Sequence, residues 1–274
     1  MSSIPRQIKS SVGKVSALAS GATARLRIAA GRPARFSGAF PSREVALASL
    51  SAEARGAYDR DDVAEVSYDA MTRVAPWDYP VLYWMNRCLA ESGSQRLSLL
   101  DAGGHLGTKY TAFGDHLPLS QVDWHLWDLP AILRAARNWQ GQGKIPAAIN
   151  FVDDPAASGP VDLLLASGLL QYLDRPLAEL IGEMAAPPRW ILLNKVAVSD
   201  AGTVVTLEQI GPAQVPYQIR DADQWAHELE ALGYTLRDSW TIPSLSHRIA
   251  THPWLPASQS RGYMLERTLP ADPS

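Results

Sequence analysis

Cysteine, net charge and long apolar runs are all scarce in this sequence, and each absence excludes a class of protein or site. One cysteine, Cys88, among 274 residues excludes an internal disulfide and a zinc centre made of several cysteines. No apolar run is long enough to cross a bilayer. The formal net charge of −3 gives no indication of a nucleic-acid partner, and histidines and acids do not cluster at metal-ligand spacing. We therefore expect a cytoplasmic protein without a nucleic-acid partner or a bound metal.

No acidic residue precedes Glu44 in the sequence. The stretch before Glu44 carries basic residues at Arg6, Lys9, Lys14, Arg25, Arg27, Arg32 and Arg35. Apolar residues recur between them at helical spacing, at Ile8, Val12, Val15 and Leu18. Residues 1–41 are thus typical of a basic amphipathic arm that contacts the anionic inner face of a membrane. A disordered tail and a helix packed on its own domain are the alternatives.

Glycine and proline punctuate the chain between residues 31 and 41, which predicts a linker. Residues 42–75 change to mixed charge with many alanines, and their short apolar groupings predict a helical cap. We expect residues 76–274 to form the main domain. Its clearest helix covers residues 76–92, where Pro80 suits the first turn and Cys88 falls on the apolar face. Cys88 is therefore expected to be packed in the core rather than to react as a thiol.

The most informative stretch is residues 98–107, in which a short apolar run ends in Asp101 and continues into a glycine-rich turn. The run predicts a buried strand, and in open α/β sheets ligands bind beyond the carboxyl ends of the strands. Gly103, Gly104 and Gly107 let the backbone turn sharply and approach a ligand. Their spacing is not the G-x-G-x-x-G of a dinucleotide site, and an acid at Asp101 would repel a pyrophosphate. A tight strand-to-helix turn without a ligand is the alternative interpretation.

Strands and helices alternate along the main domain, which predicts a doubly wound, mostly parallel sheet of the α/β class. The expected strands cover residues 98–102, 122–128, 149–152, 161–166 and 190–196. The end of the chain differs, with a strand at 204–209 in an inserted loop, a helix at 221–232 and strands at 234–242 and 262–268. The last two strands have no obvious helix between them. We therefore expect them to form an antiparallel pair at the edge of the sheet.

Polar residues follow several of these strands and are candidates for ligand contacts. Asp128 follows Asp101 at slightly more than the separation between the glycine turn and the ribose-binding acid of dinucleotide folds. It can also be the N-cap of the next helix. Asp153 follows the third strand, where an acid can receive an adenine amino group, although a surface turn explains this stretch equally well. Ser167 and Gly168 follow the central strand and leave room for a bound group.

The chain resembles class I S-adenosylmethionine (SAM) methyltransferases, and more narrowly a family of methyltransferases encoded near bacterial surface-polysaccharide genes. Its glycine stretch is similar to the first motif D-x-G-x-G-x-G, with His105 in place of the middle glycine. Further similar stretches are 80–84, 165–173, 192–195, 205–209 and 233–234, and Ala-Ser-Gly-x-x-Gln-Tyr-Leu at 166–173 is the most specific. The resemblance covers most of residues 58–265. It implies a Rossmann-like fold of five parallel strands, a last strand inserted antiparallel, and SAM as cofactor.

The resemblance implies transfer of the SAM methyl group to a small-molecule or glycan acceptor in polysaccharide biosynthesis. The cofactor-binding candidates are Asp101, Gly103, Gly104, Gly107, Asp128, Asp153, Ser167 and Gly168. The catalytic candidates, as a base or for orienting the acceptor, are His105, Tyr172, Asn194 and His247. The acceptor-binding candidates are Lys195, Gln209, Tyr217 and Arg248. For each of these side chains, ordinary packing or loop hydrogen bonding is the alternative.

Three other functions are alternatives to methyl transfer. The basic arm and the departure at His105 allow a non-catalytic SAM-fold scaffold or partner subunit, which His105 would support if it filled the cofactor pocket. A nicotinamide-dependent oxidoreductase is disfavoured because the glycine spacing and Asp101 both oppose a pyrophosphate. A hydrolase is disfavoured because no Gly-x-Ser-x-Gly setting surrounds Gly168.

Overall fold

The structure is a computed structural model that describes residues 6–51, 54, 68–93, 96–211 and 213–268, with the backbone alone for residues 6–15. The middle of the predicted cap, residues 55–67, therefore lies outside the described residues. None of the described helices combines the length and the apolar composition that a membrane span needs.

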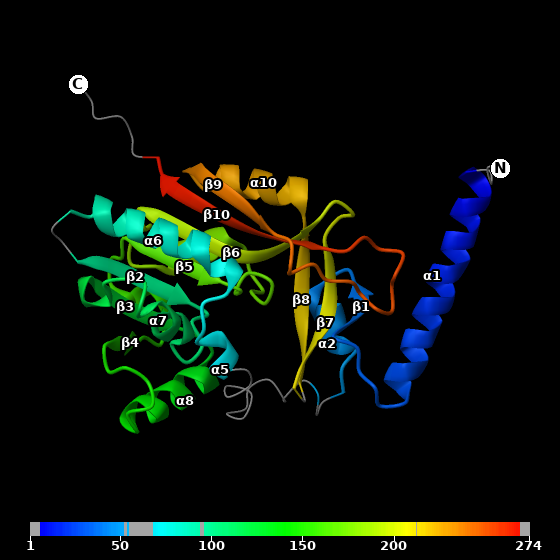
Figure 1. The fold of residues 1–274 in the computed structure, drawn as a ribbon, viewed down its shortest axis with the longest axis horizontal. Coiled ribbons are helices and arrows are strands. Elements are labelled where there is room, and N and C mark those ends of the chain that lie inside the picture. Colours follow the sequence, from blue (N-terminus) through cyan, green and yellow to red (C-terminus); the bar gives the residue numbers. More distant parts are fainter. Residues whose placement is uncertain (1–5, 52–53, 55–67, 94–95, 212, 269–274) are drawn as a thin grey trace.

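A central sheet organises the molecule (Figure 1). Its five parallel strands, in order across the sheet, are β4 (Ile149–Phe151), β3 (Val122–Trp127), β2 (Leu97–Ala102), β5 (Leu163–Ser167) and β6 (Trp190–Ser199). Beyond β6 lies β10 (Gln259–Arg267), which is antiparallel to β6 and to the outer strand β9 (Tyr234–Ile242). The predicted mostly parallel sheet with an antiparallel pair at its end is confirmed.

Two apolar layers hold helices on opposite faces of this sheet. Helices α6 (Tyr79–Glu91) and α7 (Thr108–Phe113) pack on one face, in the cluster that contains Trp124 and Cys88. Helices α9 (Leu177–Glu183) and α10 (Ala222–Ala231) pack on the other. Cys88 is 1% exposed, and burial raises the pKa of its thiol to about 12, so its predicted packing role is confirmed. The remaining helix of this region, α8 (Pro130–Gly141), contributes Leu133 to the first face.

A second, antiparallel sheet of three strands lies beside the central one. It consists of β1 (Phe36–Phe40), β7 (Val204–Ile210) and β8 (Ala213–Asp221), and β8 joins the carboxyl end of β6 through Val198 and Ser199. Two predictions are wrong here: the linker expected at 31–41 contains β1, and the inserted loop expected after residue 209 is β8. Proline is tolerated in β8 because Pro216 pairs only with Leu207 of β7 and has no strand on its other side.

The predicted helical cap is short in the part that is described. Helix α2 (Arg43–Ala48) begins at the N-cap Ser42, whose hydroxyl accepts a hydrogen bond from the Val45 amide. It packs against β8, β7 and β1, so it covers the second sheet rather than the glycine turn. A single helical turn, α5 (Tyr68–Met71), contacts α7.

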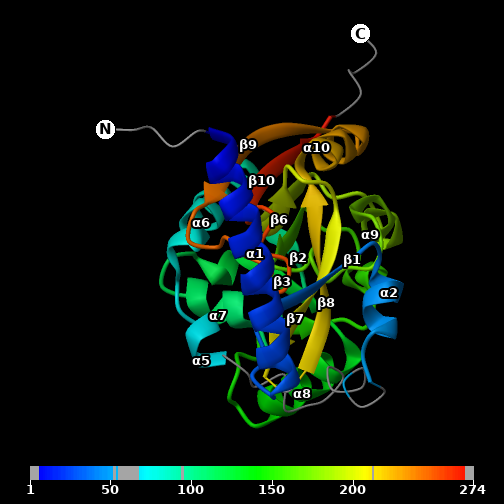
Figure 2. The same cartoon turned by 90° about the vertical axis from the view of Figure 1, so that its right-hand side faces the viewer.

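The basic arm contains helix α1 (Arg6–Ala29), which lies along the side of the second sheet (Figures 1 and 2). It docks through its C-terminal half: Gly21 is buried against Thr251 and Trp254, and Arg25 donates to the Thr251 carbonyl oxygen at 3.0 Å. A side chain at residue 21 would approach Thr251 and Trp254 within 3.0–3.2 Å, so glycine permits this contact. Leu18 and Leu26 remain 59% and 72% exposed.

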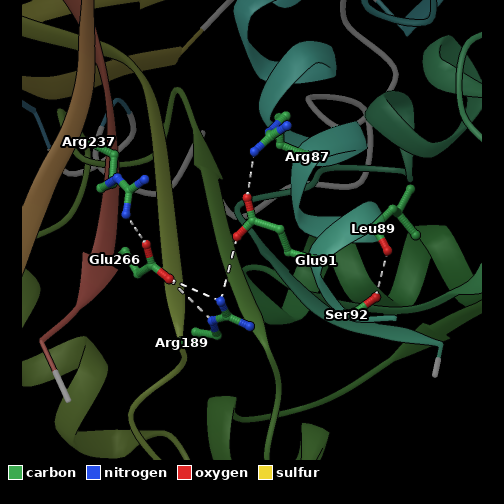
Figure 3. Close-up of polar contacts among 7 residues, drawn as sticks. All are labelled: Arg87, Leu89, Glu91, Ser92, Arg189, Arg237 and Glu266. Atoms are coloured by element: carbon green, nitrogen blue, oxygen red, sulfur yellow. Dashed lines mark hydrogen bonds and ion pairs between the residues drawn. The ribbon is translucent and has the colours of Figure 1, made fainter. Parts of the chain in front are cut away.

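Ion pairs join the elements at the amino end of β6 (Figure 3). Arg189 pairs with Glu91 of α6 and with Glu266 of β10, and Glu266 also pairs with Arg237 of β9. Arg87 extends this network by pairing with Glu91, four residues away on the same helix. These side chains are partly exposed and lie at the edge opposite the carboxyl ends of the strands. They therefore contribute little each to stability and belong to the scaffold.

Candidate functional site

The glycine turn lies at the carboxyl end of β2, as the sequence predicts. Gly103 and Gly107 have φ angles of 74° and 73°, a region that favours glycine. Gly104 is required by space instead: a Cβ there would lie 2.5 Å from Asp101 Oδ2 and 2.8 Å from a Leu126 methyl group. The turn is therefore folded tightly around the Asp101 carboxylate.

Asp101 is a buried acid with an incomplete set of hydrogen bonds. Its side chain is 1% exposed, and Oδ2 has no hydrogen-bond partner in the described structure. Burial raises its pKa to about 7, and the charge of Asp128 adds to this, whereas Lys109 opposes it. The Trp124 side chain also opposes the shift. A buried carboxylate whose oxygens are not all partnered is costly, so a cation or donor placed beside it would be bound favourably.

Asp128 follows β3 and braces the glycine turn. Its Oδ2 accepts a hydrogen bond from the His105 amide at 2.8 Å, and its Oδ1 accepts one from the Leu129 amide at 2.7 Å. The N-cap of α8 is Leu129, without a side-chain cap hydrogen bond, so the alternative in which Asp128 caps this helix is wrong. Burial raises the pKa of Asp128 to about 6, while the two amides oppose that shift. A carboxylate has about four lone-pair positions, so two amides leave it able to accept further donors.

His105 is held in an unusual backbone conformation. Its φ is 57°, and among the described non-glycine residues only Lys195 shares a positive φ. The imidazole is half-buried, its Nδ1 has no hydrogen-bond partner, and burial lowers its pKa to about 4. A neutral ring at physiological pH follows from this environment. The predicted role of His105 as a base stays a prediction.

The end of β5 and the middle of β6 bring together the next group of predicted site residues. Ser167 is paired in register with Asn194, and the Gly168 amide donates to the Asn194 carbonyl oxygen at 3.0 Å. The Asn194 side chain is 1% exposed and donates to the Trp77 carbonyl oxygen, while its Oδ1 accepts from Trp240 Nε1. Its hydrogen bonds go to the protein, which favours positioning over direct contact with an acceptor.

Lys195 lies beside this group with φ of 60°, where the ladder between β6 and β10 changes register. Its ammonium lies over the Trp77 ring, 5.6 Å from the centroid, and its side chain approaches Gly168. Burial lowers its pKa to about 8, and the Lys109 charge lowers it further, while Asp78 opposes this. Strain of this kind is tolerated where the surrounding structure fixes it, often at functional sites.

The sequence analysis did not identify a buried ion pair that links these two groups. Lys109 Nζ of α7 lies 2.6 Å from Asp78 Oδ1, and the two side chains are 9% and 0% exposed. Asp78 Oδ2 also accepts from the Ala75 amide at 3.0 Å. Through its charge Lys109 influences both Asp101 and Lys195. A lysine in a short helix after a glycine turn carries no spacing signal that would have indicated this role.

Tyr172, Tyr217 and His247 form a separate aromatic cluster with Phe36 of β1. The Tyr217 ring makes edge contacts with the rings of Tyr172, Phe36 and His247. Burial lowers the pKa of His247 to about 4 and raises that of Tyr217. The three predicted residues are thus brought together, on the second sheet rather than on the glycine turn.

Glu208 of β7 is the acid at this cluster. The Tyr172 hydroxyl donates to Glu208 Oε2 at 2.5 Å, and Arg35 donates to Oε1 through Nε and Nη2 at 3.2 and 3.1 Å. Glu208 is only 4% exposed. An acidic acceptor on the hydroxyl gives Tyr172 the geometry of an oriented, polarised phenol. Neither Glu208 nor Arg35 was identified from the sequence, because they lie far apart in the chain.

Three further candidates lie in ordinary structural environments. Asp153 is 77% exposed and pairs with Arg137 of α8 at 2.8 Å. Gln209 donates through its side chain to the Gly211 carbonyl oxygen and stabilises the hairpin between β7 and β8. Arg248 is exposed in the segment between β9 and β10. Their proposed ligand contacts stay predictions.

Gln171 was noted as part of the most specific run but not as a site residue. It is 5% exposed, its Oε1 has no hydrogen-bond partner, and its Nε2 lies 3.7 Å from the position of a Cβ on Gly168. It therefore presents a buried amide to the turn that follows the central strand. Only burial distinguishes it from its neighbours, and burial is not visible in a single sequence.

The comparisons with known proteins were made for sequence and for structure. No protein-family model matches the sequence. No curated protein matches it either. Among solved structures, the chain is similar to the Burkholderia thailandensis 1,6-didemethyltoxoflavin-N1-methyltransferase with bound 1,6-didemethyltoxoflavin and S-adenosylhomocysteine. The identity is 18%, the TM-score is 0.42, and the match covers 72% of this chain and 92% of that chain.

Two other solved structures show similar values. The glycopeptide N-methyltransferase MtfA with SAM is 14% identical at a TM-score of 0.45, over 68% of this chain and 93% of that chain. The magnesium protoporphyrin IX methyltransferase of Synechocystis PCC 6803 with S-adenosylhomocysteine is 16% identical at 0.42, over 69% and 80%. At these identities and TM-scores, the similarity assigns neither a family nor a substrate to this chain.

Proposed function

We propose that the protein is a SAM-dependent methyltransferase acting on a small-molecule or glycan acceptor. The observation that carries this proposal is a pair of acids, the buried Asp101 and the half-buried Asp128, at the carboxyl ends of neighbouring parallel strands around a glycine turn. A turn that approaches a ligand closely, with acids and no cation on it, suits a cationic nucleoside and opposes a pyrophosphate. SAM is such a nucleoside.

The residues present fit that cofactor. The orphaned Asp101 Oδ2 would face the positive end, and the lone pairs that remain on Asp128 would accept the ribose hydroxyls. Bound SAM supplies an activated methyl group that transfers by direct displacement. The chain would then orient the acceptor and exclude water, because alignment provides much of the rate in such a step.

For the acceptor side, two groups of residues support a role. Lys195 has a partly neutralised amine next to Gly168 and can hold an anionic group or accept a proton. Tyr172 with Glu208 offers an oriented phenol on the other side of the same turn. A sugar in surface-polysaccharide biosynthesis remains the acceptor that we propose from the resemblance.

A calorimetric titration with S-adenosylhomocysteine, with NAD in parallel, tests the cofactor. We expect saturable binding of the first alone. Asp128→Asn should weaken it by about tenfold, because one charged acceptor for the ribose is replaced by a neutral amide. Asp123→Asn, on a partly exposed acid of β3 that pairs with Arg96, is the matched control and should bind as the wild type does.

Failure of both ligands to bind would contradict the proposal and favour the second candidate, a non-catalytic scaffold. The half-buried imidazole of His105 in the glycine turn is the observation that favours it. His105→Gly removes the imidazole ring. It also relieves the strain of a positive φ, because glycine has no Cβ. Binding that appears only in this variant would identify His105 as the group that blocks the cofactor.

We also propose that helix α1 contacts an anionic membrane surface, which its basic residues and exposed Leu18 and Leu26 support. Deleting residues 1–30 should leave S-adenosylhomocysteine affinity unchanged and reduce sedimentation with phosphatidylserine vesicles. Deleting residues 1–41 is not equivalent, because it removes β1 with Arg35 and Phe36. Equal sedimentation of the shorter deletion and the full chain would contradict the membrane contact.

A further inference from the structure

A cavity of about 330 Å³ lies away from the glycine turn, between α2, the segment 173–176, β8 and the first turns of α10. Arg43, Arg175 and Arg220 come to it from three different elements. Arg220 is the deepest of them, at 7% exposure. Trp225 lines the cavity beside it, with the guanidinium 5.1 Å from the ring centroid.

Arg220 carries a buried charge that the protein neutralises only in part. Its Nη2 donates to the Leu170 carbonyl oxygen at 2.7 Å, but its Nη1 is buried and has no hydrogen-bond partner. Burial lowers its pKa to about 10, and the charge of Glu228 opposes this. Within the described residues, no acid pairs with it directly. An unpaired buried donor on a charged group costs more than a neutral one, so an anionic acceptor is expected.

A second donor at the cavity has the same deficit. Arg175 Nε is buried without a hydrogen-bond partner, while its Nη2 pairs with Glu183 at 2.6 Å. Arg43 uses one nitrogen, Nη1, for the Tyr172 carbonyl oxygen at 2.9 Å. Arg220 Nη1 and Arg175 Nε are thus two buried donors at the cavity for which the described protein supplies no acceptor.

Acids also line the cavity, and their positions matter for which ligand fits. Asp221 accepts from the Asp223 and Gln224 amides as the N-cap of α10, and Glu228 accepts from the Gln224 side chain. The other two, Glu44 and Asp174, are exposed. They would repel a highly charged anion entering from outside. The arrangement favours one compact oxyanion group that reaches Arg220.

We propose that this cavity binds the oxyanion group, carboxylate or phosphate, of a small molecule, with Arg220 as its principal contact and Arg43 and Arg175 beside it. Guanidinium groups match such oxyanions with two parallel hydrogen bonds, which ammonium groups do not. The site is separate from the acids of the glycine turn and does not rest on the identity of the cofactor.

The site borders the segment that follows the central strand. Arg220 and Arg43 hold the carbonyl oxygens of Leu170 and Tyr172, and the Gln218 amide holds that of Gln171. An oxyanion bound by the same guanidinium groups therefore lies close to the backbone of Gln171 and Tyr172. A ligand anchored here by its anionic group has its remaining part close to the candidate acceptor side.

The test uses the full chain and two probes at constant ionic strength, inorganic phosphate for phosphates and glucuronate for carboxylates. We expect saturable calorimetric binding of at least one probe, with the stronger one identifying the source of the oxyanion. Arg220→Gln should weaken that binding by about tenfold or more. Arg237→Gln, on an exposed arginine of β9, is the matched control and should leave it unchanged.

Arg175→Gln gives an independent variant if Arg220→Gln fails to fold, because Arg175 is less deeply buried. It should also weaken the probe, by several fold. Two outcomes would overturn the proposal: neither probe binds the wild type at about 10 mM, or the arginine variants bind it as tightly as Arg237→Gln does. Either result would leave Arg220 as a purely structural clamp on Leu170.

Discussion

Asp101→Asn is expected to stabilise the protein without ligand at pH 8 and to weaken SAM binding by about tenfold to a hundredfold. The carboxylate is buried and Oδ2 has no hydrogen-bond partner, so its ionisation costs free energy in the folded state. Asparagine has the same shape and no charge. The same charge is the feature that would attract a cationic cofactor, so stability and binding should change in opposite directions.

The sign of the pH dependence follows from the raised pKa of Asp101. The folded pKa of about 7 lies above the ordinary value of 3.8 for an aspartate, so the folded state holds the proton more tightly than the unfolded state does. The penalty is absent at low pH, grows as the pH rises from about 4, and is complete above about 7. A difference of this size corresponds to a few kcal/mol, so the variant should melt about 5 °C higher at pH 8, with a clearly smaller difference at pH 5.

Cofactor binding should show the reverse dependence. Below about pH 7 the wild type must lose the Asp101 proton to bind a cation well, so its SAM affinity should fall as the pH decreases. In Asp101→Asn only the contribution of Asp128, with a pKa of about 6, would remain. Melting curves and calorimetric titrations at pH 5, 6.5 and 8 give both results. Asp123→Asn, a partly exposed acid on β3, serves as control.

A wild-type affinity that is constant between pH 5 and 8 would contradict this role of Asp101. Equal melting temperatures of the wild type and Asp101→Asn at pH 8 would show instead that water or a neighbour compensates the carboxylate. The two readouts are independent, since the first needs a bound cofactor and the second does not.

Local patterns predicted the central sheet because each of its strands is apolar and ends in a turn. Three expected strands lie where the sequence places them: the run that leads to Asp101, the strand that leads to Ser167 and the strand that contains Asn194. The antiparallel pair β9–β10 also followed from the absence of a helix between two strands. These features depend on neighbouring residues, which a single sequence displays.

The second sheet could not be predicted in the same way. Strand β1 contains Gly38, which has a positive φ and lies where the pairing of β1 with β7 changes register. Pro216 in β8 likewise indicates a loop to any rule based on composition. Strand β8 exists because it pairs with β7 across a short turn, and β1 exists because β7 pairs with it from a distant position in the chain. Arg35 and Glu208 meet for the same reason, so the partner of Tyr172 was also missed.

Within the site, the sequence did not reveal the ion pairs between elements that are separate in the chain. Asp101 and Asp128 are visible because acids at strand ends follow a known pattern, whereas the Lys109–Asp78 pair joins a helix after the glycine turn to a turn before α6. Only the packing of those two elements brings the charges together. This pair therefore gives the sharpest test of how the scaffold holds the site.

Lys109→Met is expected to destabilise the protein by about 3–5 kcal/mol, because it leaves the Asp78 carboxylate buried and unpaired. Asp78→Asn should also destabilise the protein, since it leaves the Lys109 ammonium unpaired beside Lys195. The double variant Asp78→Asn/Lys109→Met removes both charges and should recover most of the loss. Urea denaturation of the four proteins gives the coupling free energy of the pair.

Arg87→Met provides the matched control, because it breaks an ion pair with Glu91 that is partly exposed at the opposite edge of the sheet (Figure 3). Its cost should stay below about 1 kcal/mol. If the double variant is as unstable as Lys109→Met, the loss comes from packing rather than from an unpaired charge. Recovery of stability without recovery of S-adenosylhomocysteine affinity would show that Lys109 also sets the charge balance between Asp101 and Lys195, the two groups whose pKa values it shifts.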